Sequence, residues 1–364
     1  MIIPDLDICR FQEKLVTWYQ AHHRQLPWRE SNDPYRIWIS EVMLQQTQVK
    51  TVISYFYKFI HHFPTLDELA QADLERVLKM WEGLGYYARA RNFHKAAKRI
   101  SKDLNGIIPD DFSQFKTLPG VGDYIGAAVQ SIAFGHPFAV VDGNVKRVLA
   151  RLYCLRHPVN KSSSHQYFKG HADLLLEKKD PGTFNQAMME LGALICTPRN
   201  PQCTVCPVSQ FCKAFLSDRM DEYPRRVKAK KVPTYHIAAG IVRKKGQMLI
   251  TRRKLDGLLG GLWEFPGGKL KTGEDAASAC IREIQEETGI CVQTDAHLTT
   301  VHHAYTHFKI QMDIYYCTYV SGSVHLNGPI DFRWIRLKEL DTFAFPKANL
   351  KFIPMIEENL SHSV

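Results

Sequence analysis

Apolar residues recur every three or four positions through most of the first 216 residues, which is the spacing that places them on one face of an α-helix. This pattern predicts a helix over residues 8–23, helical structure over residues 37–60 and four or five further helices up to about Leu216. Few stretches in this part alternate apolar and polar residues, as half-buried strands do. We therefore predict an all-α region.

The pattern changes after residue 233. Residues 237–242 and 248–251 are predicted strands on either side of a turn, residues 276–288 are a predicted helix, and residues 310–320 a further strand. A basic segment with two prolines precedes them and is predicted to be a linker. The predicted organisation is an all-α region of residues 1–222, a linker of residues 223–233 and a mixed α+β domain of residues 234–364.

Composition and charge narrow the class of partner. A length of 364 residues suits two or three domains, and 47 Lys and Arg against 37 Asp and Glu give a net charge of +10, which favours a polyanion such as nucleic acid. The first ten residues contain acids and no apolar core, and no apolar run approaches the roughly 18 residues of a membrane span. We expect no membrane contact and a cytoplasmic location, so that the nine cysteines are free thiols or metal ligands.

A turn with two glycines lies between two short helical patterns, residues 112–118 and 124–134. Gly120 and Gly122 allow backbone N–H groups to approach a phosphate closely, so we expect a helical hairpin that contacts phosphate. A polar run, residues 45–48, would supply amide contacts to base edges if it lies on a helix that faces DNA.

Two carboxyl groups stand in contrasting surroundings. Asp142 ends an apolar run and takes the N-cap position of a helical pattern over residues 143–152, where the helix end favours the ionised form. Glu41 shares a helix face with apolar neighbours, where lost hydration raises a carboxyl pKa. Two carboxyl groups of different acidity suit acid-assisted cleavage of a glycosidic bond. An exposed Glu41 and a plain N-cap Asp142 are the alternatives that this pattern leaves open.

Four cysteines form the strongest local signal. Cys196, Cys203, Cys206 and Cys212 leave gaps of six, two and five residues within a proline-containing segment. Four thiolates so close in sequence can surround one cofactor. Zinc sites usually show two close cysteine pairs, and here there is one.

The hairpin, Asp142 and the four-cysteine loop resemble the helix-hairpin-helix DNA glycosylases, whose loop of this spacing holds a 4Fe–4S cluster. Within that superfamily, residues 26–29, 40–49, 83–87 and 141–151 resemble adenine DNA glycosylase of the MutY type, which removes adenine mispaired with 8-oxoguanine. The resemblance implies duplex DNA with adenine opposite 8-oxoguanine as the partner of a monomeric enzyme.

The same resemblance implies roles for individual residues. Glu41 would protonate the imidazole ring of an extruded adenine, and Asp142 would stabilise the oxocarbenium-like sugar through a covalent intermediate. Tyr124 and Asn144 would assist them. The implied substrate and DNA contacts are Arg29, Gln46, Leu84, Tyr86, Gly120, Gly122, Lys146 and Gln186.

One position bears on the type of reaction. Superfamily members that also cut the strand carry a Schiff-base lysine eighteen residues before the aspartate, and here Tyr124 stands at that position. The resemblance therefore implies base excision without strong strand cleavage. Asp123 and Ile125 depart from the family pattern, which has a basic or polar residue and a threonine there. Asp123 would be unfavourable beside a bound phosphate unless its side chain points away.

The C-terminal part contains a full Nudix box from Gly268 to Ile290. Its acids Glu283, Glu286 and Glu287 lie on one helical face, where they repel each other unless Mg²⁺ or Mn²⁺ sits among them. The flanking residues resemble the MutT nucleotide hydrolases, and Asn349 stands at a position that reads purines in them.

In MutY-type proteins this domain recognises 8-oxoguanine in DNA, and Tyr305, Thr306 and His307 resemble that recognition loop. Two interpretations remain open: the domain reads the lesion alone, or it also hydrolyses oxidised nucleoside triphosphates. Against hydrolysis, Arg333 stands beside Trp334, where an extra glutamate would be expected. Two alternatives for the whole chain are a Nudix pyrophosphohydrolase with a DNA-binding N-terminal part and a damage-binding protein without catalytic activity.

Overall fold

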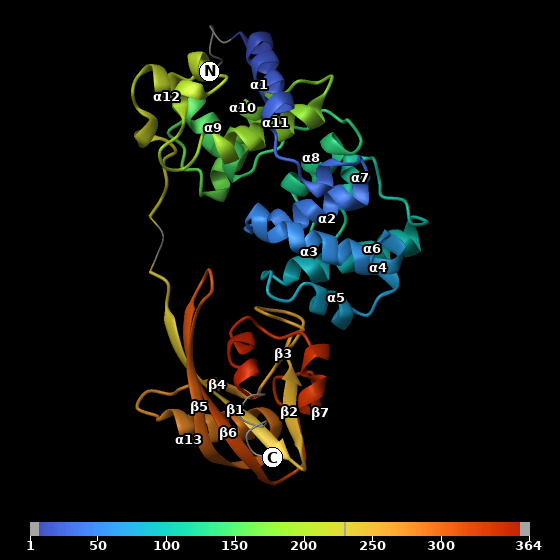
Figure 1. Cartoon of the computed structure of the whole chain (residues 1–364), viewed down its shortest axis with the longest axis vertical. Coiled ribbons are helices and arrows are strands. Elements are labelled where there is room, and N and C mark those ends of the chain that lie inside the picture. Colours follow the sequence, from blue (N-terminus) through green and yellow to red (C-terminus); the bar gives the residue numbers. More distant parts are fainter. Residues whose placement is uncertain (1–6, 229–230, 357–364) are drawn as a thin grey trace. The chain divides into compact units, whose positions relative to one another are not determined.

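The computed structural model describes residues 7–228 and 231–356, and it divides into two compact units (Figure 1). The first unit holds the described residues of 1–71 and 95–229, and the second holds those of 72–94 and 230–364. The segment of residues 72–94 is therefore grouped with the C-terminal residues, although it lies within the N-terminal half of the sequence. The three sequence ranges given above stay a prediction.

The first unit is entirely helical, as predicted. Its helices are α1 (Ile8–His22), α2 (Pro34–Leu44), α3 (Val49–His62), α4 (Leu66–Gln71), the second half of α6 (Ala88–Asp103), α7 (Phe112–Lys116), α8 (Asp123–Ile132), α9 (Gly143–Leu152), α10 (His165–Leu175), α11 (Pro181–Leu194) and α12 (Lys213–Leu216). More helices follow residue 60 than the four or five expected. Several of them have only one or two turns, too short to show a clear apolar period.

The helix expected over residues 37–60 is interrupted. α2 ends at Leu44 and α3 begins at Val49, because Gln46 adopts the left-handed backbone region with φ 58°. The N–H of Thr47 donates to the carbonyl of Leu44 at 3.2 Å and closes the turn. The expectation that residues 45–48 lie on a helix is therefore wrong, and these polar residues form a turn instead.

A core of large apolar side chains joins α1, α9, α10 and α11. Phe11, Leu149, Phe168, Phe184 and Leu191 are almost fully buried in it. Burial of an aromatic or leucine side chain contributes roughly 1.5–3 kcal/mol each. This core fixes the position of the N-terminus of α9, where Asp142 lies.

The predicted helical hairpin is formed by α7 and α8. Gly120 has φ +81°, which favours glycine, and Gly122 is the N-cap of α8 with open space around its α-carbon. Asp123 forms an ion pair with Lys116 at 2.5 Å, and its carboxylate also lies 3.8 Å from His165. The Lys116 ammonium thus offsets the negative charge that the sequence places beside this turn, and its hydrogen bond lowers the pKa of Asp123.

The second unit contains a seven-stranded mixed sheet, in the order β3-β2-β1-β6-β5, with β4 paired to β1 and β7 to β2. β1 and β6 run parallel, with Ala238 opposite Asp313, and the other pairs are antiparallel. The strands are β1 (Thr234–Lys244), β2 (Gln247–Arg252), β3 (Trp263–Glu264), β4 (Gly267–Lys269), β5 (Cys291–Ala304), β6 (Lys309–Ser321) and β7 (Asp331–Ile335), with α13 at Ala276–Thr288.

Residues 72–94 contribute α5 (Leu74–Met80) and the first half of α6 to this unit. The indole N–H of Trp263 donates to the Glu75 carboxylate at 2.6 Å, and the N–H of Phe345 donates to Glu82 at 2.7 Å. These contacts connect residues far apart in sequence, which explains why the segment is grouped with the sheet. In the parts of the chain that the structure describes, no helix has the length and apolar character needed to cross a bilayer.

Candidate active site

A small cavity of about 160 Å³ in the first unit brings together residues from α2, α8, α9 and α11. It is lined by the predicted residues Glu41, Tyr124, Asp142, Asn144, Gln186 and Arg29. Two others that sequence reasoning did not single out, Arg24 and Glu190, also line it. Residues separated by more than 160 positions in the sequence therefore meet in one site.

Glu41 lies on the buried side of α2, one turn from the end of that helix. The hydroxyl of Tyr124 on α8 donates a hydrogen bond to its Oε2 atom. Burial raises the pKa of Glu41 to about 7, and the charge of Asp142 acts in the same direction, while the Tyr124 hydrogen bond opposes the shift. Glu41 can therefore hold a proton near neutral pH, as the sequence predicts.

Asp142 caps α9 as predicted. Its Oδ1 atom accepts from the N–H of Val145 at 2.7 Å, and its Oδ2 atom accepts from the side-chain amide of Asn144 at 2.9 Å. Arg147 donates in turn to the amide oxygen of Asn144 at 2.9 Å and to the carbonyl of Gly192 at 2.7 Å. A Cβ on Gly192 would lie 2.6 Å from the Cβ of Asn144, so this contact requires glycine.

Two opposing effects act on the pKa of Asp142. The helix end was expected to hold this carboxyl in its ionised form, and burial raises its pKa above the ordinary value. The hydrogen bonds from Val145 and Asn144 oppose that shift and stabilise the ionised form. Asp142 thus accepts two short hydrogen bonds, whereas Glu41 is a buried carboxyl with one hydroxyl donor.

The cavity has a positively charged edge that the motif analysis did not detect. Arg24 and Arg29 donate to the buried carboxylate of Glu190 at 2.7–2.9 Å. Burial alone would raise the pKa of Glu190, but these hydrogen bonds lower it to about 2. The available signal was an acid within the apolar run of α11. In the same cavity lining, the amide oxygen of Gln186 accepts from the Tyr19 hydroxyl at 3.2 Å.

This arrangement combines a proton donor with a second carboxyl group in one small cavity. A group on one side can be protonated by Glu41 while positive charge on the other side is stabilised by Asp142. Lys146 follows Asp142 on α9 and is half-buried, and burial lowers its pKa. Gln46, by contrast, does not line this cavity and lies in the exposed turn after α2.

The four predicted cysteine ligands share one loop that runs from the end of α11 to α12. Burial raises the pKa of Cys206 to about 12, and the charges of the other three thiols add to the shift. Arg151 donates to the Cys196 sulfur at 3.3 Å, and Arg147 donates to the Cys196 carbonyl at 2.7 Å. Four thiolates flanked by arginines fit an anionic iron–sulfur cluster.

Among residues 7–228 and 231–356, no three His, Cys, Asp or Glu side chains stand close enough to hold a single metal ion. In the Nudix box, Arg282 instead contacts Glu283 at 2.7 Å and Glu286 at 3.1 Å, and it pairs with Glu274 at 2.7 Å. Arg282 thus offsets the charges of Glu283 and Glu286, whereas the charge of Glu283 still raises the pKa of Glu287, as expected for carboxylates that repel each other. Glu287 points elsewhere and accepts from the Gly267 N–H at 3.2 Å.

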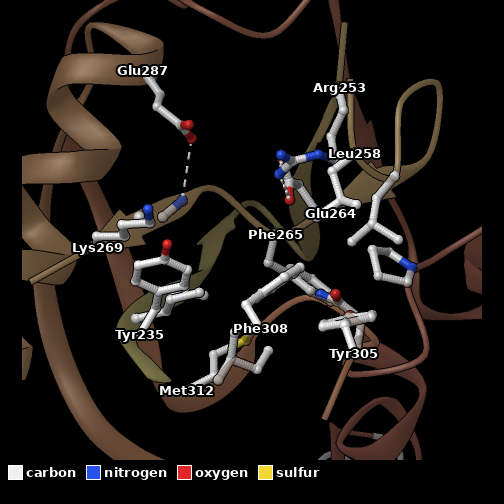
Figure 2. A pocket seen from close by; sticks show the side chains of 18 of the residues that line it. Tyr235, Arg253, Leu258, Glu264, Phe265, Lys269, Glu287, Tyr305, Phe308 and Met312 are labelled. Carbon is white, nitrogen blue, oxygen red and sulfur yellow. Dashed lines mark hydrogen bonds and ion pairs between the residues drawn. The ribbon is translucent and has the colours of Figure 1, made fainter. Parts of the chain in front are cut away.

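A cavity of about 570 Å³ lies beside the Nudix helix α13 (Figure 2). Arg253 and Glu264 form an ion pair at 2.7 Å in its wall, and Glu287 lies on the same cavity. Burial raises the pKa of Glu287 to about 8, and the charge of Glu264 adds to the shift. The sequence analysis did not identify Glu264 as a cavity residue. Its position between the apolar residues Trp263 and Phe265 was the signal that could have indicated a buried charge.

A second cavity of the same unit, of about 320 Å³, lies between the predicted recognition loop and residues 83–88. Leu84, Tyr86, Tyr305, Thr306 and His307 all line it. The hydroxyl of Tyr86 is hydrogen-bonded to that of Thr306. The structure therefore places together two predicted groups of DNA-contacting residues that lie more than 200 positions apart in the sequence.

The loop over residues 257–260 contributes Gly257, Leu258 and Leu259 to the lining of the 320 Å³ cavity. Arg91 is buried, and its guanidinium donates to the carbonyl of Gly260 at 2.6 Å and to that of Gly257 at 3.5 Å. One side chain of α6 thus holds the loop that carries Leu258 and Leu259.

The chain matches three known families. Residues 39–169 match the HhH-GPD superfamily of base excision DNA repair proteins, residues 196–212 match the iron-sulfur binding domain of endonuclease III, and residues 237–355 match the NUDIX domain. These matches confirm the predicted fold class and support an iron–sulfur cluster in the four-cysteine loop.

Individual relatives extend the likeness to almost the whole chain. The adenine DNA glycosylase of Homo sapiens is 33% identical over 401 residues, which cover 95% of this chain and 73% of the human protein. The adenine DNA glycosylase of Buchnera aphidicola subsp. Acyrthosiphon pisum is 31% identical over 353 residues, covering 96% and 98% of the two chains. A solved thermostable thymine-DNA glycosylase has a TM-score of 0.53 at 29% identity, over 58% of this chain and 97% of that one.

The HhH-GPD superfamily performs base excision repair, the relatives are DNA glycosylases, and a cavity with two carboxyl groups in different environments is consistent with that chemistry. The chain is a DNA glycosylase of base excision repair, and it belongs to the adenine DNA glycosylase family.

Proposed function

We propose that this protein removes adenine paired with 8-oxoguanine, or with guanine, from duplex DNA by acid-assisted cleavage of the N-glycosidic bond. The observation that carries the proposal is the shared cavity of Glu41 and Asp142, in which Tyr124 bonds to the first and Asn144 to the second.

The division of labour follows from the two environments. Glu41 holds a proton near neutral pH and donates it to the imidazole ring of an extruded adenine, so that the bond electrons pass to the base as it leaves. Asp142, stabilised as an anion by Val145 and Asn144, faces the sugar that becomes positively charged. Gln186 lies on the same cavity and supplies an amide for the base edge.

Strand cleavage is not expected from this site. A Schiff base requires an amine, and the residue that reaches Glu41 from α8 is the hydroxyl-bearing Tyr124. Burial raises the pKa of Tyr124 well above its ordinary range, so the phenol stays protonated and serves as a hydrogen-bond donor.

Recognition of 8-oxoguanine is supported by the 320 Å³ cavity in the second unit. Its wall combines the aromatic rings of Tyr86 and Tyr305 with the polar side chains of Thr306 and His307. Aromatic faces stack on a purine while hydroxyl and imidazole groups bond to its polar edge. We propose that this cavity distinguishes 8-oxoguanine from guanine.

The test is a single-turnover assay of the wild-type protein. Duplexes with adenine opposite 8-oxoguanine, guanine or thymine are incubated, and released adenine is quantified before and after alkali treatment of the strand. We expect release opposite 8-oxoguanine and guanine, with strand breaks that appear only after alkali. Equal release from the thymine duplex, or breaks without alkali, contradicts the proposal.

A second activity is favoured by the 570 Å³ cavity beside the Nudix helix. We propose that the second unit hydrolyses oxidised deoxynucleoside triphosphates at this cavity, with Mg²⁺ or Mn²⁺ held by Glu283, Glu286 and Glu287. Asn349 lines this cavity and is buried, which suits recognition of a base. In the described side chains Arg282 binds Glu283 and Glu286, so the acids do not converge on one point and metal binding would require Arg282 to move.

A single substitution can test whether adenine release and triphosphate hydrolysis occur at different sites. Glu286→Gln should abolish any hydrolysis of 8-oxo-deoxyguanosine triphosphate in the presence of Mg²⁺ and leave adenine release unchanged, because Glu286 does not line the glycosylase cavity. Loss of adenine release in this variant would show that the division between the two sites is wrong. Pyrophosphate release from the wild-type protein is the measurement.

A further inference from the structure

The two cavities of the second unit share one wall. Both the 570 Å³ cavity and the 320 Å³ cavity are lined by Leu258, Leu259, Tyr305, His307 and Phe308. Tyr305 stacks on Phe308 with ring centroids 4.7 Å apart and planes 24° apart. The two cavities therefore adjoin along these five residues.

The larger cavity has the chemistry of a nucleotide site. Its aromatic rings, Tyr235, Phe265 and Phe308, offer flat surfaces for a base (Figure 2). Asn349 also lines it and is only 3% exposed. Within residues 7–228 and 231–356 no group hydrogen-bonds its side-chain amide, and because its polar atoms are not sealed from solvent they can bond to a ligand in the cavity.

The larger cavity also has cationic side chains. Lys269 lies at the same cavity, with its ammonium 3.7 Å from the centroid of the Tyr235 ring, and Arg253 lies in the wall beside Glu264. An amide that can both donate and accept suits a purine edge. The Lys269 ammonium suits a phosphate, whereas the charge of Arg253 is paired with that of Glu264. The volume of about 570 Å³ is in the range of small-molecule sites.

We propose that the larger cavity binds a purine nucleotide and that the bound nucleotide competes with the lesion base for the shared wall, which lowers the preference for adenine opposite 8-oxoguanine. This inference depends on the proposed role of the smaller cavity in reading 8-oxoguanine. It does not depend on hydrolysis, because binding alone occupies the wall.

The competition has a specific physical cause. The imidazole of His307 borders both cavities, and a ring that turns to bond to a nucleotide in one cavity moves the nitrogen that would face a base in the other. A nucleotide that draws His307 and Tyr305 toward itself removes a polar contact and a stacking surface from the lesion base. Coupling between two such sites is reciprocal and typically changes affinity by about 5–150-fold.

The experiment measures adenine release from full-length protein with and without nucleotide. Duplexes with adenine opposite 8-oxoguanine or guanine are assayed with EDTA present, after addition of deoxyguanosine monophosphate, its 8-oxo form, or deoxycytidine monophosphate as the pyrimidine control. A monophosphate cannot undergo pyrophosphohydrolysis, so binding is tested apart from hydrolysis. We expect a purine monophosphate to lower the preference for 8-oxoguanine over guanine about fivefold or more.

Two variants locate the effect in the larger cavity. Asn349→Ala and Lys269→Ala change residues that line this cavity and do not line the smaller one. The nucleotide effect, measured within each variant as the ratio with and without nucleotide, should be lost in both. Lys269 is exposed, so its variant is informative even if truncation of buried Asn349 prevents folding.

The outcomes are distinguishable. A preference for 8-oxoguanine that no purine monophosphate changes overturns this inference while the proposed function stands. A nucleotide effect that persists in Lys269→Ala overturns it as well, because the nucleotide then acts elsewhere. If wild-type protein without nucleotide shows no preference for 8-oxoguanine, the proposed function fails first.

Discussion

Replacing Glu41 with glutamine tests the protonation state on which adenine release depends. Burial raises the pKa of Glu41 from 4.5 to about 7, so the folded protein keeps a proton that the unfolded chain releases. The free energy of unfolding therefore falls as pH rises from about 4.5 to 7, and the full cost is present above 7. A shift of this size corresponds to about 3 kcal/mol.

Glutamine cannot ionise, and its amide oxygen can still accept from Tyr124. We expect Glu41→Gln to be more stable than wild type by up to about 3 kcal/mol at pH 8 and about equally stable at pH 4. Adenine release should be abolished, because the amide has no proton of suitable acidity to donate. In wild type, the rate should decline above pH 7 as Glu41 ionises, and it should also decline in acid as Asp142, whose pKa burial raises, takes up a proton.

Urea unfolding at several pH values, followed by single-turnover assays, gives both quantities. Glu190→Gln is the matched control, because Arg24 and Arg29 lower the pKa of Glu190 to about 2. Its ionised form stabilises the fold above about pH 4.5, and that stability is lost as pH falls toward 2, so this variant should be less stable than wild type at pH 8. A Glu41→Gln protein that is no more stable than wild type at pH 8, or that releases adenine at the wild-type rate, refutes the reasoning.

Three other predictions follow from the remaining contacts. Asp142→Asn should abolish adenine release but retain duplex binding in a gel-shift assay, because the amide keeps the geometry of the α9 cap and loses the charge; loss of binding as well would indicate a structural role. Cys206→Ala should remove the visible absorption of the iron–sulfur cluster and weaken DNA binding, and retained colour would exclude Cys206 as a ligand. Arg91→Ala should release the loop of residues 257–260 and lower the preference for 8-oxoguanine over guanine, with release opposite guanine as the internal control; Arg91→Lys should restore part of it, and an equal loss on both duplexes would indicate general damage to the fold.

Local signals in the sequence were sufficient for much of the fold. The helix at Ala276–Thr288 and the strands on either side of residue 245 agree with the pattern, because apolar spacing reports which face of an element is buried. The N-cap role of Asp142 depends on its own neighbours, and it was predictable for the same reason. The turn at Gln46 was missed, since no glycine or proline marks its left-handed residue.

These local signals could not predict contacts between segments that are far apart in the sequence. The pairing of Glu190 with Arg24 and Arg29 joins α11 to the segment after α1, and no spacing within either segment encodes it. The same holds for Arg282, which the motif places on the acidic helix but whose position among the glutamates depends on side-chain packing.

The sequence by itself determined the all-α and α+β architectures, the acidic and cysteine motifs and the identity of both carboxyl groups. Each of these can be recognised from residues that are close together in the sequence. Tertiary structure decided that Glu41 and Asp142 meet in one cavity, and that burial raises the pKa of both. It also decided that Tyr305 and His307 border two cavities at once. Burial and shared walls are properties of the packed chain, since desolvation depends on every segment that surrounds a group and not on its own neighbours in sequence.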